Sequence, residues 1–102
     1  MIAIYDDDQC TVDVIKAVLE SHDFRNIQTY TKEDEILKAL ESGHVGLIIT
    51  DMTGHDVVLN RIRMLGVVHI TMSGDKNNKP HLDKPFDMAH LIRLVKERLC
   101  SA

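Results

Sequence analysis

Several short apolar runs of this sequence each end in a polar residue, and this pattern favours a sheet of buried strands. Residues 2–5 are apolar and are followed by three aspartates, and residues 46–50 lead directly into another aspartate. Counting two later runs, the polar residues at the ends are Asp6–Asp8, Asp51, Ser73 and Lys84. If the runs are buried parallel strands, these groups all emerge at one edge of one sheet, where open α/β sheets bind ligands.

The chain alternates these runs with stretches that carry apolar residues at three- and four-residue steps, which is typical of repeated βα units and a parallel sheet. The expected strands are 2–5, 26–30, 46–50, 67–72 and 81–83. Asp56–Leu65 is expected to form a short helix, with Gly43 and Gly66 as helix ends and Asp87 as the cap of the last helix. Thr31–Asp34 resembles a capping box.

Size and composition indicate one domain over residues 1–102, with 44% hydrophobic residues and a net charge of −4. This charge argues against a nucleic-acid surface, which needs clustered Lys and Arg. No apolar run is long enough to span a membrane, and no secretory signal is visible, so a cytoplasmic location is expected. Cys10 and Cys100 are expected to be unpaired thiols.

The four polar clusters suit a divalent cation and a phosphoryl group. Mg²⁺ usually takes one or two protein carboxylates together with phosphate oxygens and water, and Asp7 and Asp51 could supply them. Asp6 would act through water or a hydrogen bond. A carboxylate can also attack phosphorus, while the Ser73 hydroxyl and the Lys84 ammonium would neutralise the phosphoryl oxygens.

Each of these residues alone has an ordinary explanation. The three aspartates could be a solvated turn or a helix N-cap cluster, and Asp51 could be a turn residue. Ser73-Gly74 is a common turn dipeptide, and Lys84 could be a surface lysine before a loop proline. The ordered set, with one member at each strand end, is much harder to obtain by chance.

The chain resembles the response-regulator receiver domains of two-component signalling over essentially its whole length. The matching segments are Ile4–Asp8, Ile48–Met52, Ile70–Gly74 and Leu82–Phe86. The resemblance implies a flavodoxin-like (CheY-like) doubly wound α/β fold, with a five-stranded parallel sheet in the order 2-1-3-4-5. It also implies site roles: Asp51 as phosphoacceptor, Asp6 and Asp7 as the acidic pair around Mg²⁺, Ser73 as the hydroxyl and Lys84 as the lysine.

Further expectations follow from the same resemblance. The Thr53 carbonyl would be an additional Mg²⁺ ligand, and the Lys84–Pro85 peptide bond would be cis. The phosphoryl donor would be a phosphohistidine on a sensor histidine kinase or a histidine phosphotransfer protein. Such a domain is not an enzyme in the usual sense, since it catalyses only its own phosphorylation and dephosphorylation, and without an output domain it would signal through protein–protein contact.

The chain departs from the family between Ser73 and Lys84. Only ten residues separate these positions, and they resemble a loop, so the fourth helix of the family is expected to be missing and about four helices to remain. The aromatic switch position, three residues before the lysine, is His81. A missing helix would leave one face of the last two strands uncovered, which predicts a homodimer or partner contact there.

The six histidines show no metal-ligand spacing. His55, close after Asp51, could line the mouth of the site, and this possibility carries little weight from sequence alone. His81 could be a pH-sensitive switch, although a solvent-facing histidine on an edge strand is the simpler reading.

Two other functions stay open at this point. A phosphorylation-independent pseudo-receiver would keep the fold as an interaction module, and the lost helix and His81 favour it. A phosphatase of the haloacid-dehalogenase type would use Asp6 as its nucleophile, because residues 6–8 contain Asp-x-Asp. In that enzyme Asp51 would have no role.

Overall fold

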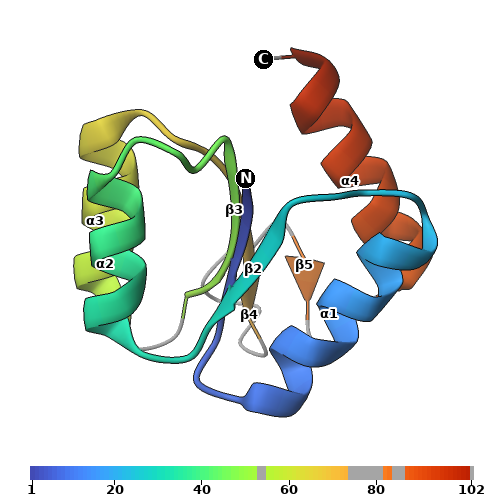
Figure 1. The fold of residues 1–102 in the computed structure, drawn as a ribbon, viewed down its shortest axis with the longest axis horizontal. Coiled ribbons are helices and arrows are strands. Elements are labelled where there is room, and N and C mark those ends of the chain that lie inside the picture. The colour runs from blue at the N-terminus through green and yellow to red at the C-terminus, as the bar shows by residue number, and fades with distance from the viewer. Residues whose placement is uncertain (53–54, 74–81, 84–86, 102) are drawn as a thin grey trace.

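The fold is a parallel sheet covered by helices on both faces (Figure 1), as seen in a computed structural model that describes residues 1–52, 55–73, 82–83 and 87–101. The strand order is β2-β1-β3-β4-β5, and all four strand pairs are parallel. The strands are β1 Ile2–Tyr5, β2 Ile27–Tyr30, β3 Leu47–Asp51, β4 Val68–Ser73 and a two-residue β5, Leu82–Asp83. The predicted α/β class and order 2-1-3-4-5 are confirmed.

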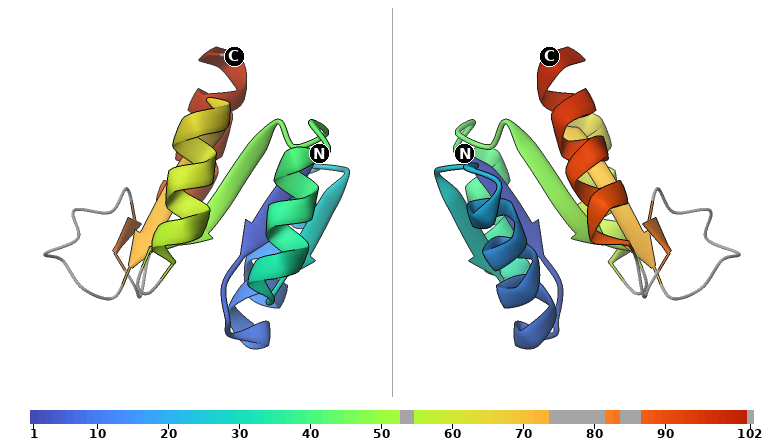
Figure 2. Two further views of the ribbon diagram at one scale, coloured as in Figure 1. Left: turned by 90° about the vertical axis from the view of Figure 1, so that its left-hand side faces the viewer. Right: turned by 90° about the vertical axis from the view of Figure 1, so that its right-hand side faces the viewer.

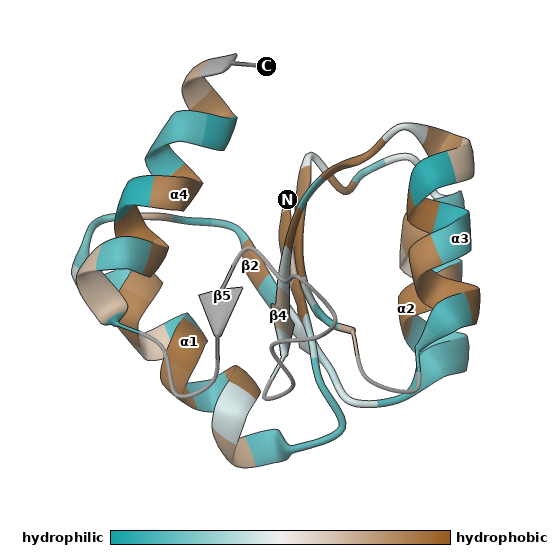
Figure 3. Cartoon of the chain, turned by 180° about the vertical axis from the view of Figure 1, so that it is seen from behind, coloured by the Kyte–Doolittle hydropathy of each residue, from teal (hydrophilic) through white to brown (hydrophobic). Residues whose placement is uncertain are grey.

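The four helices within the described ranges form two layers, one on each face of the sheet. Their bounds are α1 Gln9–Ser21, α2 Glu33–Glu41, α3 Asp56–Leu65 and α4 Met88–Ser101. Helices α2 and α3 lie together on one side, and α1 and α4 lie on the other (Figure 1). Each helix carries both hydrophilic and hydrophobic residues (Figure 3), as expected for helices with one face against a sheet.

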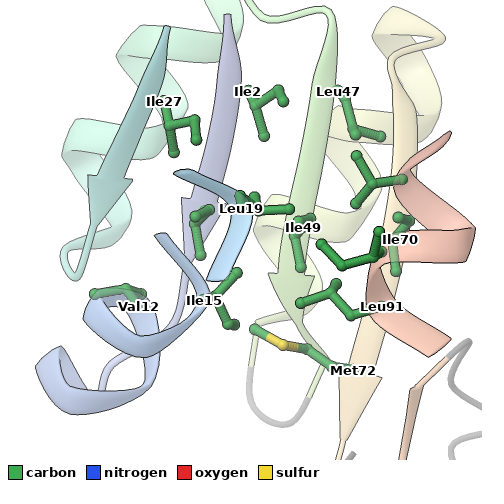
Figure 4. Close-up of a cluster of buried hydrophobic side chains, with 13 residues drawn as sticks. Ile2, Val12, Ile15, Leu19, Ile27, Leu47, Ile49, Ile70, Met72 and Leu91 are labelled. Carbon is green, nitrogen blue, oxygen red and sulfur yellow. The ribbon is translucent and has the colours of Figure 1, made fainter. Parts of the chain in front are cut away.

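The side chains of the strands alternate between two cores because successive residues point to opposite faces of the sheet. Ile2 and Ile4 pack with α1 and α4 in the core shown in Figure 4, whereas Ala3 and Tyr5 pack on the side of α2 and α3. All four residues of β1 are buried. Such burial on both faces explains why the strand reads as a continuous apolar run and not as an alternating one.

The helix ends agree with the sequence in most places. Asp8 caps α1 by accepting the Cys10 N–H, and Asp87 accepts the Ala89 N–H at the start of α4. The capping box predicted at residues 31–34 is wrong. Helix α2 begins one residue later than the box requires, at Glu33, so its N-cap is Lys32, whose side chain makes no capping hydrogen bond.

The predicted uncovered face is not found on β4, since residues 70–73 are all buried. The expectation is therefore wrong for this strand. The loop expected after Ser73 falls on residues outside the described ranges, as do the β5 side chains, and the dimer or partner contact stays a prediction. Both cysteines are free and exposed, as expected. None of the helices in the described ranges is long and apolar enough to cross a bilayer.

Gly66 ends α3 in the left-handed conformation, with φ at +68°, and its N–H bonds to the Arg63 carbonyl. A Cβ there would meet no atom within 4 Å, so only backbone strain opposes a side chain. We predict that Gly66→Ala lowers the free energy of unfolding by about 1 kcal/mol, measured by urea denaturation.

Gly46→Ala is the matched control. The backbone of Gly46 is outside the left-handed region, and a Cβ would make an ordinary contact with the Met1 carbonyl at 3.9 Å. Its unfolding free energy should stay the same or rise by less than about 1 kcal/mol. Equal losses in the two variants would contradict the assignment of strain to Gly66.

Candidate functional site at the carboxyl edge of the sheet

The strand register brings the predicted polar residues to one edge of the sheet. Tyr5 of β1 pairs with Thr50 of β3, and Asp51 pairs with Met72 of β4. The residues that follow β1 and end β3 and β4 therefore share the carboxyl edge, and Figure 2 shows the strand arrows pointing to the same end of the molecule. The order of the strands reverses between β1 and β3, so this edge includes the topological switch point of the sheet.

The three aspartates after β1 do different things. Asp6 is buried, and its Oδ1 accepts the backbone N–H of Asp8 at 2.9 Å. Asp8 is the N-cap of α1 and also accepts the Thr11 hydroxyl at 2.8 Å, so for this residue the ordinary structural explanation holds. The side chain of Asp7 is 72% exposed, so it is open to a ligand from solvent.

Asp51 and Ser73 lie at the ends of the neighbouring strands. Asp51 is the last residue of β3 and is 8% exposed, and Ser73 is the last residue of β4 and is fully buried. The sequence predicted both positions. Thr53, His81, Lys84 and Pro85 lie outside the described residues, so the roles predicted for them, including the cis peptide bond, stay predictions.

His55 is the residue that sequence reasoning undervalued. It lies in the turn between β3 and α3 and is the N-cap residue of α3, and its side chain is buried. Its Nε2 lies 3.3 Å from Asp51 Oδ2 and 3.4 Å from Asp7 Oδ1. The ring therefore joins the two carboxylates that the sequence placed in the site, although these come from strands far apart in the chain.

The other side of the His55 ring contacts Tyr5. The Tyr5 hydroxyl and His55 Nδ1 share a hydrogen bond of 3.1 Å, and the two rings pack edge to face with centroids 4.8 Å apart. Tyr5 is itself 1% exposed. The available signal for His55 was its place four positions after Asp51, in the turn that follows the apolar run, but its buried partner lies 50 residues earlier in the chain.

The acidic surroundings act on Tyr5. Burial raises the pKa of the Tyr5 hydroxyl to about 12, and the negative charge of Asp7 is the next largest cause. Glu33, Asp51 and Asp6 act in the same direction. Each of them disfavours a phenolate, so the site concentrates negative potential around the end of β1.

The carboxylates suit an open site for a hard cation such as Mg²⁺, and not a closed site made of protein ligands alone. Within the described ranges, no group of three or more His, Cys, Asp and Glu side chains is arranged to hold a metal ion. Mg²⁺ does not need such a group, because it commonly binds through one or two carboxylates and takes its other oxygens from water and phosphate. Asp7 and Asp51, which converge on the same nitrogen, match that smaller requirement.

The fold is shared with solved structures. The structure described as a transiently phosphorylated "switch" in bacterial signal transduction superposes with a TM-score of 0.84 at 20% identity, covering 98% of this chain and 94% of that chain. A CheY-like receiver domain protein from Methanospirillum hungatei gives 0.81 at 21% identity, with coverages of 98% and 93%. This chain has the receiver-domain fold.

The likeness to receiver domains is one of structure. A response regulator from Thermotoga maritima matches with a TM-score of 0.75 at 23% identity, covering 97% of this chain and 96% of that chain. A de novo designed Rossmann 2x3 protein matches nearly as well, at 0.73. No protein-family model and no curated protein matches the sequence. The receiver-like function therefore has to be argued from the site.

We predict that the phenolic proton of Tyr5 is lost near pH 12, and that Asp7→Asn lowers this pKa because it removes the largest charge contribution. The measurement is the near-ultraviolet absorbance of phenolate against pH, with Tyr5→Phe identifying the signal. Stability that depends on the neutral hydroxyl should be present below pH 10 and disappear as the pH rises toward 12. An unchanged titration in Asp7→Asn would contradict the proximity of the two groups.

Proposed function

We propose that the chain is a phosphoacceptor receiver domain in which Asp51 accepts a phosphoryl group. The observation that carries this proposal is the convergence of Asp7 and Asp51 at the carboxyl edge, within 3.4 Å of one nitrogen. The receiver-domain fold and the buried Ser73 hydroxyl at the end of the adjacent strand support it.

The chemistry would be a transfer between two nucleophiles. An oxygen of the Asp51 carboxylate attacks phosphorus, the P–N bond of a phosphohistidine donor breaks, and the imidazole leaves with the electron pair. The phosphoryl group carries charge on three equatorial oxygens, so positioning and charge neutralisation supply most of the catalysis. Bound Mg²⁺ would neutralise part of that charge, held by Asp7 and Asp51, with Asp6 acting through water and the Thr53 carbonyl as a further ligand.

Two further side chains would complete the phosphoryl site. The Ser73 hydroxyl would donate a hydrogen bond to one oxygen, and the Lys84 ammonium would pair with another. The donor would be a sensor histidine kinase or a histidine phosphotransfer protein. The chain would then act as a signalling protein that turns over only its own aspartyl phosphate, and it would pass the signal on by protein–protein contact in the cytoplasm.

One structural observation favours a second function. The His55 ring lies against both carboxylates, where phosphoacceptor chemistry requires access for a cation and a donor. A pseudo-receiver that keeps the fold as an interaction module, without phosphorylation, would tolerate this arrangement. The phosphatase alternative has less support, because Asp6 is buried and its Oδ1 is hydrogen-bonded within its own turn.

Incubation with Mg²⁺ and a small phosphodonor such as acetyl phosphate tests the proposal. We predict a mass gain of one phosphoryl group that is stable in acid, labile to hydroxylamine and absent from Asp51→Asn. The loss should be complete, because an amide cannot form the acyl phosphate. Intact-protein mass spectrometry provides the measurement.

Asp13→Asn is the control for a general effect of removing one carboxylate. Asp13 is exposed on α1, and its side chain accepts a hydrogen bond from Gln9. It should be labelled like the wild-type protein. No labelling of the wild-type protein, with its fold intact, would support the pseudo-receiver. Hydrolysis of a phosphate ester that survives Asp51→Asn but not Asp6→Asn would instead support the phosphatase.

A further inference from the structure

We infer that His55 is a gate for the cation: its ring fills the space between Asp7 and Asp51 and must turn away before a divalent ion can bind both carboxylates. The inference deepens the proposed function and rests on it, since it concerns the same two acids. It assigns a positioning role to a residue that the transfer chemistry itself does not use.

The geometry of Nε2 carries this inference. The atom is within 3.4 Å of an oxygen of each aspartate, so the ring occupies the space in which an ion bound to both carboxylates would need room for its water and phosphate ligands. The side chain of Asp51 is 12% exposed and that of His55 is 6% exposed, so the ring is enclosed on the Asp51 side. Asp7 is open to solvent, which provides a direction from which a cation can enter.

The contacts of Nε2 are close but poorly directed. Nε2 is buried and makes no hydrogen bond within the part of the chain that the structure describes, although both carboxylates lie within ion-pair distance. A buried polar atom without a well-formed hydrogen bond is a weak point of the structure. Displacing this end of the ring therefore breaks no well-formed hydrogen bond and gives Nε2 access to water.

The opposite edge of the ring is what holds it in place. Nδ1 shares the 3.1 Å hydrogen bond with the Tyr5 hydroxyl, and the two rings pack edge to face. The backbone of His55 is fixed as well, because its N–H bonds to the Met52 carbonyl and its own carbonyl accepts the Leu59 N–H. A side-chain rotation is thus the available movement, and Tyr5 opposes it.

A contrasting reading makes His55 a metal ligand. Imidazole nitrogen is a good ligand for transition metals, whereas Mg²⁺ prefers oxygen. The arrangement favours the gate, since within the described ranges no group of three or more His, Cys, Asp and Glu side chains is placed so that it could hold a metal ion. The two readings predict opposite effects of removing the ring, so one titration separates them.

The test is calorimetric titration of the whole chain with Mg²⁺, comparing wild-type protein with His55→Ala. We predict that the variant binds Mg²⁺ about tenfold more tightly, the scale on which groups around a metal site alter affinity. Tyr5→Phe removes the hydrogen bond to the His55 ring but keeps the aromatic packing, so it should increase the Mg²⁺ affinity by a smaller factor. If His55→Ala does not fold, Tyr5→Phe still tests the inference. Circular dichroism checks that each variant is folded.

His44→Ala is the matched control, because His44 is exposed in the turn before β3, at the opposite edge of the sheet. Its Mg²⁺ affinity should equal that of the wild-type protein. A second readout is the imidazole ¹⁵N spectrum of wild-type protein, in which the His55 signals should shift when Mg²⁺ saturates the site.

The outcomes separate the inference from the proposed function. Weaker or equal Mg²⁺ binding by folded His55→Ala, with binding by wild-type protein, overturns the gate and leaves the phosphoacceptor proposal standing. Absence of Mg²⁺ binding by both proteins overturns the gate together with the metal-dependent function. Tighter binding by both His55→Ala and Tyr5→Phe, but not by His44→Ala, establishes the gate.

Discussion

The parallel register of β1 and β3 places the acidic residues of the candidate site together. It sets Tyr5 beside Thr50, so that Asp6 and Asp7 leave the sheet at the level where Asp51 ends the neighbouring strand. A slip of one residue would move each side chain to the other face of the sheet. The register is fixed by burial, because β1 and β3 are buried on both faces between the two helical layers.

The pair formed by Tyr5 and His55 connects this register to the chemistry. Tyr5 is the last residue of β1 and packs on the side of α2 and α3, where its hydroxyl reaches His55, the residue just before α3. Through His55 the end of β1, the end of β3 and the start of α3 become one cluster. A change in the position of this ring would alter its contacts both with the acidic residues and with the helix layer that covers one face of the sheet.

Much of the fold could be predicted from the sequence because it depends on local patterns. The strand end at Tyr5 and the helix at Asp56–Leu65 follow from apolar periodicity and turn residues, and β3 and β4 end one residue later than predicted, at Asp51 and Ser73. The capping box predicted at Thr31–Asp34 is wrong because it needs the helix to begin directly after Thr31, and α2 begins one residue later. The prediction of an uncovered face on β4 is wrong because the burial of a strand depends on how the whole chain packs. His55 was undervalued because its role comes from Tyr5 and Asp7, which only the folded sheet brings near.

Asp7 and Asp51 are proposed to form one cation site at the carboxyl edge of the sheet. A crystal structure of the chain with Mn²⁺, which resembles Mg²⁺ in its preference for oxygen and is visible by anomalous scattering, tests this most directly. We predict an anomalous peak bonded to carboxylate oxygens of both residues, with the His55 ring turned away from them. Mn²⁺ bound at full occupancy elsewhere, with no ion on Asp7 or Asp51 and with the His55 ring still between them, would contradict this site.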